Sequence, residues 1–448
     1  MPANVVRFGG ENIGKPEVIQ SFVTILKASS EKQVIVLSAS KKIQQILQSG
    51  LELLRLSSKD HTAIISQLNE YAKQIRGQQQ LEKVAAFDAQ LLPLARLLQG
   101  IHFTGDYSLA LRDQVLSYAE VLTTCLLHDI LQHYQLNTKL FLTDEIPLVV
   151  SQEYGNASVL GKASAKTLKS LEWQQINLVP GSFGKTQSGK ISRLGDRAAD
   201  YSAAALAALL LAQKLELWEI SKSFKTVDET IVPGSNYIEQ LSYSEASELA
   251  YFNHSSIHPR IVEPLLEQQL PIHVFQLLNG EKVLKTTISS PQSAKIQTVK
   301  SVAHSDDIAI LKLNGPGVGF KPGILAIITS AFANHRINIR SVITAQTSIN
   351  IIINKADRQL AEKLARELEL PSVNEVKVVS NISLIAIVGH GMQANYGISA
   401  QLFAAVAKHK INVLLSGSGA SDLVSYLIVD EQDKTQAIQE IHKIFFNN

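Results

Sequence analysis

The chain has 448 residues, which is too long for one ordinary domain and enough for two or three. Apolar residues make up 45% of the sequence and charged residues 18%, so we expect several buried cores and not a disordered chain. The 42 lysine and arginine residues against 40 aspartate and glutamate residues leave a formal charge of +2, which argues against a dedicated nucleic-acid binder.

The one cysteine, Cys125, excludes an internal disulfide, and its helical setting predicts a buried thiol. Cysteines and histidines show no spacing typical of structural zinc, so we predict no metal site. The first residues lack the basic and then apolar pattern of a signal peptide, and the longest uncharged apolar stretch, Tyr201–Gln213, is too short to cross a bilayer. These features predict a soluble, cytoplasmic protein of several domains.

Strand and helix patterns alternate through the first 290 residues. The chain opens with a short strand, Val5–Phe8, and continues with a helix from Pro16 to Ser29 and a continuous apolar strand over Gln33–Ser38. Residues 43–135 are mainly helical in pattern, and strand-like runs return at Lys139–Leu142, Ile176–Val179 and Leu215–Trp218. This alternation predicts an α/β fold with a mostly parallel sheet covered on both faces by helices.

A polar stretch, Ser289–Ala294, is typical of a linker, and the clearest internal repeat follows it. When residues 308–338 are shifted by 74 positions, 11 of the 31 columns are identical, against about two expected by chance. Each copy reads as a strand, a glycine-containing turn, a helix and a strand, which in the first copy are Ile308–Leu313, Pro322–Ala333 and Ile337–Val342. Two small βαββαβ modules in tandem are completed by further strands at Ile349–Ile353 and Val424–Val429 and further helices at Asp357–Glu367 and Lys434–Ile444.

We therefore predict three domains, over residues 1–290, 291–378 and 379–448. Neither repeat carries a close pair of carboxylates, a nucleophile beside a base or a metal cluster, so both are predicted to be binding modules. His335 and His409 occupy equivalent places near helix ends, which favours a structural role for both.

Four segments of the chain resemble those of one family, the aspartokinases. Arg7–Gly10 resembles the Lys-Phe-Gly-Gly of the first strand, and Asp200–Ala204 resembles the opening of a central helix. Leu241–Phe252 together with Ile257–Arg260 is the longest match, and Gly417–Asp422 is close to a signature of the family's paired ACT domains. The resemblance implies an amino-acid-kinase fold followed by two tandem, ferredoxin-like ACT domains, without an appended homoserine dehydrogenase. It also implies phosphorylation of the side-chain carboxylate of L-aspartate, with MgATP as cofactor.

The resemblance also implies roles for particular positions. A carboxylate and a polyphosphate must be held together against their repulsion, so glycine turns approach phosphate oxygens and a cation neutralises the developing charge. The implied catalytic positions are Arg7 and Asp200, and the implied phosphate or nucleotide positions are Gly9, Gly10, Gly184 and Asp228. The implied substrate positions are Ser38, Glu120, Arg193 and Arg197, and the implied effector positions in the ACT pair are Gly323, Ile324, Asn338 and Gln346.

Several of these positions depart from the family's pattern. Arg7 stands where the family has a lysine, and an arginine is larger and planar, so it does not simply replace a compact ammonium at a crowded transition state. Glu11 and Asn12 replace Thr-Ser, and a carboxylate at that point would repel substrate or phosphate. Asp196 stands in place of the aspartate-binding arginine, and the side chain of Arg197 restricts backbone that a family glycine leaves free.

The stretch after Trp218, which holds the nucleotide in the family, has changed most. Of its aspartates, tyrosine and Asp-Pro-Arg segment, only Asp228 remains. A phosphate-binding Gly-Ala-Lys is replaced by Asn253–Ser255. His258 matches a structural His-Pro of the family, and we predict that it does not bind a metal together with His254. More of the family's nucleotide-binding residues are therefore replaced in this chain than of its amino-acid-binding residues.

These losses favour a diverged aspartokinase-like protein of aspartate-pathway amino-acid biosynthesis that is catalytically weak or inactive. Its retained work would be amino-acid sensing or assembly through the ACT domains. One alternative is an enzyme or binder for another acidic metabolite that does not use ATP. The other is a functional aspartokinase with a site rebuilt from Arg7, Lys185, Arg193 and Arg197.

The ACT pair also departs from the pattern of lysine-sensing relatives. Arg340 and Gln346 stand where those relatives have an aspartate and a glutamate, so an ammonium side chain would meet repulsion. Lysine is therefore disfavoured as effector, while threonine, an acidic ligand or no ligand stay open. The predicted partners are an amino acid and either a second copy of the chain or an active relative, with no nucleic acid and no membrane.

Overall fold

The structure is a computed structural model that describes residues 4–56, 61–219, 224–252, 257–278, 280–290 and 298–446. It divides into two compact units, which are described one after the other. The first comprises residues 1–224, 237–250 and 254–292, and the second comprises residues 225–236, 251–253 and 293–448.

The first unit is built on an eight-stranded sheet. Its strand order is β3-β4-β2-β1-β7-β9-β10-β8, and all described pairings are parallel except that between β9 and β10. The mostly parallel sheet that the alternation of strands and helices predicted is therefore confirmed. Its strands are β1 (Asn4–Phe8), β2 (Gln33–Leu37), β3 (Lys139–Leu140), β4 (Ile176–Pro180), β7 (Leu215–Glu219), β8 (Gln240–Ser242), β9 (Ile272–Leu278) and β10 (Glu281–Ser289).

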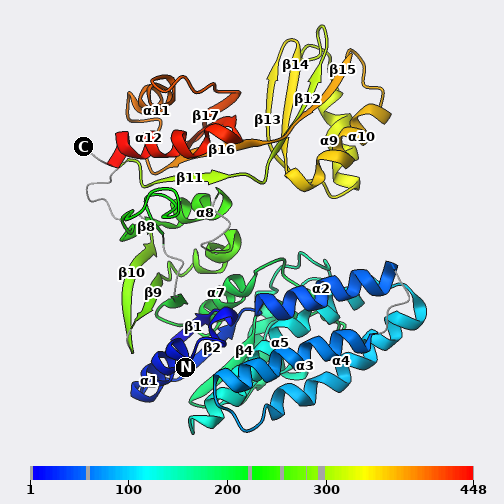
Figure 1. Ribbon diagram of the computed structural model, residues 1–448, viewed down its shortest axis with the longest axis vertical. Helices are drawn as coiled ribbons and strands as arrows, with labels where there is room; N and C mark the ends of the chain where they lie inside the picture. Colours follow the sequence, from blue (N-terminus) through cyan, green and yellow to red (C-terminus); the bar gives the residue numbers. More distant parts are fainter. Residues whose placement is uncertain are drawn as a thin grey trace. The chain divides into compact units, whose positions relative to one another are not determined.

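Helices cover both faces of this sheet. The side chains of β1 contact a different helix on each face. Successive side chains of a strand point to opposite faces. Phe8 stacks on Phe22 of helix α1 (Pro16–Ala28), with ring centroids 4.2 Å apart. Arg7, one residue earlier, instead pairs with Asp200 of helix α7 (Ala199–Leu209). Helices α1 and α7 therefore lie on opposite faces of β1 (Figure 1).

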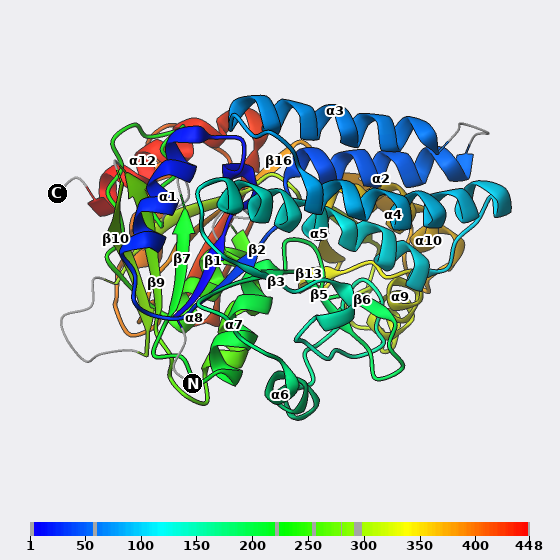
Figure 2. The same ribbon diagram turned by 90° about the horizontal axis from the view of Figure 1, so that it is seen from below.

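Four long helices form the helical part of the first unit, as the pattern of residues 43–135 predicted. They run side by side in Figure 2 and are α2 (Lys41–Leu56), α3 (Thr62–Gln78), α4 (Ala85–Thr104) and α5 (Leu109–His133). Helix α5 is buried along most of its length because it packs against β2 and β4 on one side and α2 and α4 on the other. Cys125 lies on it and is fully buried, and burial raises the pKa of its thiol.

Shorter elements complete the first unit. The hairpin of β5 (Phe183–Lys185) and β6 (Ile191–Arg193), which the sequence patterns did not predict, lies beside the main sheet as a separate pair of strands. The remaining elements are α6 (Gly161–Ser170), α8 (Tyr243–Phe252) and the 3-10 helices η1 (Gly10–Asn12), η2 (Thr143–Glu145) and η3 (Pro259–Leu265). Across the described residues of both units, no helix has the length and apolar character that spanning a membrane requires.

The second unit holds two four-stranded antiparallel sheets, each with helices packed on it. One sheet has the order β13-β14-β12-β15 and comprises β12 (Ala309–Asn314), β13 (Ile339–Ala345), β14 (Ser348–Ile353) and β15 (Glu375–Val379), with helices α9 (Ile324–Asn334) and α10 (Arg358–Glu367). The other has the order β11-β16-β18-β17 and comprises β11 (Ser301–Ser305), β16 (Ile382–Val388), β17 (Leu415–Ser421) and β18 (Val424–Asp430), with helices α11 (Ile398–Ala407) and α12 (Lys434–Phe446). The 3-10 helices η4 (Lys355–Asp357) and η5 (Glu431–Asp433) precede α10 and α12. The repeated strand and helix patterns are thus all present.

Strand β11 departs from the predicted bounds of the modules. It lies within residues 291–378, yet it pairs with β16 and completes the sheet of the second module. The second module supplies only β16, β17 and β18 itself, so β11 covers an edge of the fully buried strand β16 that would otherwise have unpaired N–H and C=O groups. The first module is therefore inserted between the fourth strand of the second module and the rest of it.

A second departure concerns the segment Lys225–Asn236, which we call the arm. It lies between β7 and β8 in the sequence but belongs to the second unit. Val227 forms a parallel bridge with Val302 of β11, whose backbone N–H donates to the Thr226 carbonyl oxygen at 2.8 Å. The Thr226 hydroxyl lies 3.0 Å from Nε2 of His442 on α12. The arm thus extends the sheet of the second module beyond β11.

The arm also contributes to the hydrophobic core of that module. Val227 is only 2% exposed and packs within the cluster formed by β11, β16, β18, α11 and α12. Ile231 and Val232 pack against the same cluster. The sequence left open whether residues 218–230 fill a nucleotide pocket. Residues 220–223 of that stretch lie outside the described residues.

We predict that Val227→Ala loosens the second module, because it removes two buried methyl groups at a cost of about 2 kcal/mol. Amide hydrogen exchange followed by mass spectrometry should then be faster in β11 and α12. The matched control is Val283→Ala on β10, since Val283 is 38% exposed in the first unit and its truncation should leave exchange unchanged. Equal protection of β11 in the two variants would contradict the packing of the arm.

Candidate active site

The carboxyl ends of β1 and β2 bring together the glycine turn and Ser38. The backbone N–H of Gly10 donates to Ser38 Oγ at 3.1 Å. A Cβ atom on Gly10 would overlap the carbonyl oxygen of Ser38 and lie 2.7 Å from the backbone nitrogen of Ser40. A side chain at Gly10 therefore does not fit, and the glycine is explained by this close approach of two backbones.

Arg7 and Asp200, the two positions that the resemblance implied to be catalytic, form an ion pair. Arg7 Nε is 2.5 Å from Asp200 Oδ1, and both side chains are more than nine-tenths buried. The other carboxylate oxygen of Asp200 accepts a 2.8 Å hydrogen bond from the backbone N–H of His258. Asp200 also lies in the first turn of α7, where the helix dipole favours a negative charge. Both oxygens of this carboxylate are thus engaged inside the protein.

Glu120 and Arg193 form a second buried pair in the first unit. Arg193 Nη2 lies 3.4 Å from Glu120 Oε1, and the two residues are 4% and 2% exposed. Burial raises the pKa of Glu120, while the nearby charge of Arg193 and the hydroxyl of Ser182 act against that rise. Arg193 Nε and the hydroxyl of Ser192 are buried without a hydrogen-bond partner among the described residues. Buried polar atoms of this kind are typical of a site that a ligand or water completes.

Helix α5 holds this pair in place through a residue that the sequence analysis did not select. Asp113 lies two helical turns before Glu120 and therefore on the same face of α5. Its Oδ2 accepts hydrogen bonds from the backbone N–H groups of Arg193 at 2.8 Å and Gly155 at 2.7 Å. Burial raises the pKa of Asp113, and these hydrogen bonds act against the rise. The seven-residue spacing of the two acids on one helix was the signal that could have identified Asp113.

Three further candidate positions are explained by their local surroundings. Arg197 is exposed, with a backbone φ of 56°, so it occupies the left-handed conformation that a glycine adopts more easily. A Cβ atom on Gly184 would lie 2.6 Å from the carbonyl oxygen of Leu148, so packing alone explains that glycine. Asp228 belongs to the arm, and its carboxylate accepts hydrogen bonds from the backbone N–H and the hydroxyl of Thr230.

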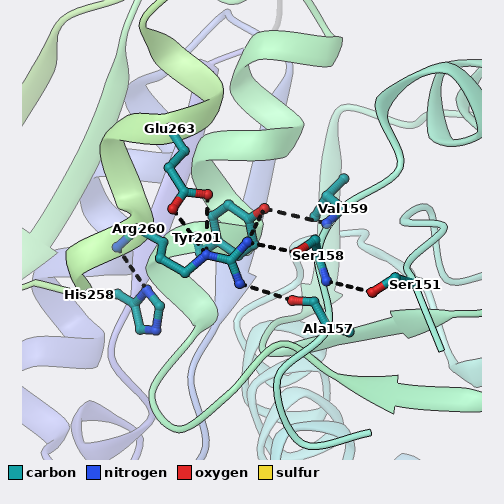
Figure 3. Close-up of polar contacts among 8 residues, drawn as sticks. All are labelled: Ser151, Ala157, Ser158, Val159, Tyr201, His258, Arg260 and Glu263. Carbon is teal, nitrogen blue, oxygen red and sulfur yellow. Dashed lines mark hydrogen bonds and ion pairs between the residues drawn. The ribbon is translucent and has the colours of Figure 1, made fainter. Parts of the chain in front are cut away.

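Arg260 organises the loop beside α7 (Figure 3). Its guanidinium lies over the ring of Tyr201, 4.4 Å from the ring centroid. It donates hydrogen bonds to the Ala157 carbonyl oxygen (3.1 Å), the Ser158 hydroxyl (2.9 Å), the Tyr201 hydroxyl (3.1 Å) and the Glu263 carboxylate (3.1 Å). These contacts tie the loop of residues 151–159 to α7 and η3, so the matched motif ending at Arg260 has a structural use.

His258 is also engaged within the protein. Its Nδ1 accepts a 3.2 Å hydrogen bond from the backbone N–H of Arg260, and burial lowers the pKa of the imidazole. His254, the other member of the pair considered as metal ligands, lies outside the described residues. No group of three or more potential metal ligands occurs in the part of the chain that the structure describes.

The candidate effector positions lie around the start of α9 and the strands that follow it. Gly323 caps α9 with a φ of 94°, which favours glycine, and Ile324, the first residue of α9, is buried in the core of the module. Asn338 and Gln346 are exposed. The guanidinium of Arg340 bonds to Asn354 Oδ1 at 2.8 Å and to the Ser305 hydroxyl at 3.2 Å, and it lies 3.6 Å from the Asp307 carboxylate.

The equivalent histidines make local contacts. His335 Nδ1 lies 2.9 Å from the Ala331 carbonyl oxygen at the end of α9. His409 contacts two side chains of α12, Gln436 at 3.0 Å and Glu440 at 3.0 Å. These contacts are of the structural kind that their positions near helix ends predicted.

Comparison with known proteins identifies two matching families. The amino acid kinase family matches residues 3–276, and the ACT domain matches residues 385–445. The bifunctional aspartokinase/homoserine dehydrogenases of Buchnera aphidicola and Haemophilus influenzae are 25% and 27% identical over 99% of this chain. The chain spans only 56% of each of these relatives. Aspartokinase 2 of Arabidopsis chloroplasts is 25% identical, and 84% of its length is covered.

A similar fold is also present among solved structures. E. coli aspartokinase III in complex with aspartate and ADP superimposes with a TM-score of 0.81 at 21% identity, over 99% of this chain and 100% of that one. The same enzyme in complex with lysine and aspartate gives a TM-score of 0.77 at 21% identity, over 99% of each chain. At this level of identity the likeness concerns the fold.

The buried pair of Arg7 and Asp200 yields a stability prediction. Arg7→Met and Asp200→Asn should each lower the free energy of unfolding of the first unit by about 3 kcal/mol, because each leaves a buried charge or dipole without its partner. The double variant should lose about 2 kcal/mol less than the sum of the two single losses. Urea unfolding followed by tryptophan fluorescence measures this directly, since Trp173 and Trp218 both lie in the first unit.

The control for this cycle is the exposed pair of Lys73 and Glu70, 2.7 Å apart on α3. Solvent screens such a pair, so its coupling should stay below about 1 kcal/mol. Additive losses at Arg7 and Asp200 would contradict a direct interaction between them.

Proposed function

The chain belongs to the amino acid kinase family and is an aspartokinase-family protein with an ACT domain, and from this premise we propose that it is a regulatory or assembly protein with little or no kinase activity. In this proposal the kinase-type unit keeps an amino-acid site, and the paired ACT-type modules sense a small molecule and contact a second chain. That chain is a further copy of the protein or an active aspartokinase. A cytoplasmic location stays a prediction.

The observation that carries the proposal is the pairing of Arg7 with Asp200. Transfer of a phosphoryl group between two anions needs a cation that is free to neutralise charge on the transferred group. The guanidinium of Arg7 is held 2.5 Å from the Asp200 carboxylate, which already cancels its charge. The planar guanidinium is also larger than the ammonium it replaces. The proposal follows because Arg7 stabilises the fold by pairing with Asp200 and so is not free to neutralise charge on a transferred phosphoryl group.

The arm supports the same conclusion on the nucleotide side. By resemblance, the stretch after β7 holds the nucleotide in active aspartokinases. Here the arm packs in the core of the second unit. The carboxylate of Asp228 accepts hydrogen bonds from the backbone N–H and the hydroxyl of Thr230. MgATP is therefore not proposed as a bound cofactor of this chain.

The pair of Glu120 and Arg193 supports a retained amino-acid site. An amino acid presents a carboxylate and an ammonium, and these match a buried guanidinium and a buried carboxylate respectively. Arg193 Nε and Ser192 Oγ are hydrogen-bonding atoms without a partner among the described residues. A small acidic metabolite other than aspartate meets the same requirements, so the ligand class is an acidic amino acid or a close analogue.

The proposed sensing site is the region of Gly323, Ile324, Asn338 and Gln346. A ligand there would bind mainly to backbone N–H groups and exposed amides, because the nearby cation Arg340 is already held by Asn354 and Ser305. The related E. coli aspartokinase III has been solved with lysine. For this chain a lysine effector is not proposed, since Gln346 offers no negative charge to an ammonium group.

Isothermal titration calorimetry of the purified chain with MgATP, with and without L-aspartate, tests the proposal. We expect no binding heat up to millimolar MgATP and no change in thermal unfolding. Binding at 100 times the dissociation constant would add about 2.7 kcal/mol of stability, so even moderate affinity would be visible. L-Aspartate alone should bind, and Arg193→Gln should weaken that binding by at least about tenfold.

Micromolar binding of MgATP would contradict the proposal. It would support the alternative of a functional aspartokinase whose site is rebuilt from Arg7, Lys185, Arg193 and Arg197. A matched control for the aspartate arm is Arg96→Gln, which removes a charge from α4 and should leave aspartate affinity unchanged. Equal loss in both variants would rule out Arg193 as the specific contact.

A further inference from the structure

The first unit contains a cavity between helix α1 and the starts of β1 and β2, with a volume of about 310 Å³. Asn4, which lines it, lies on the same side of β1 as Phe8, since the two residues are four positions apart. Phe8 stacks on Phe22 of α1, whereas Arg7 pairs with Asp200 on the other side of the strand. The sheet therefore separates the cavity from the pair of Arg7 and Asp200.

The cavity has a largely apolar wall and a side that is open to solvent. Leu26 of α1 and Trp218 of β7 are buried in its wall, while the lining residues Thr24, Ala28 and Glu31 are exposed. Its volume is at the small end of the range for small-molecule sites, so a ligand of about ten non-hydrogen atoms fits and a nucleotide does not. The cavity therefore suits a small metabolite with an apolar body.

A buried carboxylate beside the cavity is surrounded by an excess of positive charge. Glu216 is fully buried, with Oε1 2.8 Å from Lys214 Nζ. Its Oε2 accepts hydrogen bonds from Lys282 Nζ at 2.8 Å and Trp218 Nε1 at 2.7 Å. Burial acts to raise the pKa of Glu216, but these three contacts lower it overall, and burial lowers the pKa of the nearby His273. At neutral pH two ammonium groups thus face one carboxylate, which leaves one positive charge.

Lys282 brings this positive charge to the cavity, which it lines. Its ammonium lies over the rings of Trp218 and Phe275, 5.3 and 4.8 Å from the ring centroids, and these rings and Glu216 hold it in place. Of its three N–H donors, only the one directed to Glu216 has a hydrogen-bond partner among the described residues. Lys282 can therefore donate a charge-assisted hydrogen bond to a carboxylate in the cavity.

Asn4 offers the complementary acceptor. It is 8% exposed, and its Nδ2 donates to Gln33 Oε1 at 3.2 Å. Its Oδ1 is buried without a hydrogen-bond partner among the described residues, which costs free energy until a ligand or water supplies a donor. The carboxylate of Glu31 at the open side attracts a positive group. An ammonium group on the ligand would satisfy Asn4 Oδ1 while a carboxylate binds Lys282.

We propose that this cavity is a binding site for an aliphatic amino acid of the size of leucine. The ligand carboxylate binds Lys282, and the ligand ammonium group binds Asn4 Oδ1 beside Glu31. The aliphatic side chain packs on Leu26 and Trp218. The inference goes beyond the proposed function and does not depend on it, because the cavity shares no residue with the candidate active site or with the candidate effector positions.

Calorimetric titration of the full chain with L-leucine tests the inference. We expect a dissociation constant of about 1 mM or tighter. The analogue 4-methylpentanoate lacks the ammonium group and isopentylamine lacks the carboxylate, so each should bind at least about tenfold more weakly. Equal binding of L-leucine and 4-methylpentanoate would overturn the assignment of an amino acid, and no heat from L-leucine would overturn the site.

The location is tested with a variant that fills the cavity from an exposed position, so that the fold is retained. Thr24→Phe places a ring at the open side and should weaken L-leucine binding at least about tenfold. The matched control is Gln20→Phe, which adds the same ring at an exposed position of α1 that does not line the cavity and should leave binding unchanged. Equal L-leucine affinity of the two variants would overturn the inference.

The role of the cation is tested with Lys282→Gln, in which Glu216 keeps Lys214 as its partner. This variant should bind L-leucine at least about tenfold more weakly. Lys285→Gln removes the same charge from the same strand and should leave binding unchanged, because Lys285 lies over the ring of Tyr237 and does not line the cavity. Equal effects of the two changes would contradict a direct contact with Lys282.

Discussion

The buried charges of the first unit must find their partners within the protein, and the pair of Arg7 with Asp200 is the contact through which β1 and α7 meet this constraint. Both side chains are more than nine-tenths buried, so each offsets part of the cost of removing the other from water. Asp200 is further held by the backbone of His258, whose ring accepts the N–H of Arg260. From there Arg260 fixes the loop of residues 151–159. The pair of Arg7 and Asp200 therefore anchors a chain of contacts from β1 to the loop of residues 151–159.

Much of the fold could be predicted from the sequence because its signals are local. Continuous apolar runs marked β2 and β4, and the 74-residue repeat marked both small modules. The partners of β11 and of the arm could not be predicted in this way. Strand β11 pairs with β16, some 80 positions later in the chain, and the arm reaches the same sheet from between β7 and β8. Which open edge a strand completes depends on the other edges present in the folded unit, and periodicity carries no information about them.

For the candidate site, the sequence identified several of the residues but not their contacts. The resemblance to the aspartokinases selected six residues that the structure places in three contacts: Arg7 with Asp200, Gly10 with Ser38 and Glu120 with Arg193. Their roles stay predictions. What could not be predicted is how each charge is balanced. The sequence predicts that the charge of Glu11 repels phosphate. In the structure the Glu11 carboxylate accepts a hydrogen bond from the backbone N–H of Lys41. Asp113 was not selected, although its seven-residue spacing from Glu120 places both acids on one face of α5, and its contacts with two backbone N–H groups became visible only in the fold.

The central claim is that this chain does not transfer a phosphoryl group to a carboxylate. An acyl phosphate is trapped by hydroxylamine as a hydroxamate, so incubation of the concentrated protein with MgATP, L-aspartate and hydroxylamine tests the claim directly. The account predicts no hydroxamate above the level without protein, including when stoichiometric amounts of the chain are used. Hydroxamate that accumulates over several turnovers and disappears in the Asp200→Asn variant would contradict it.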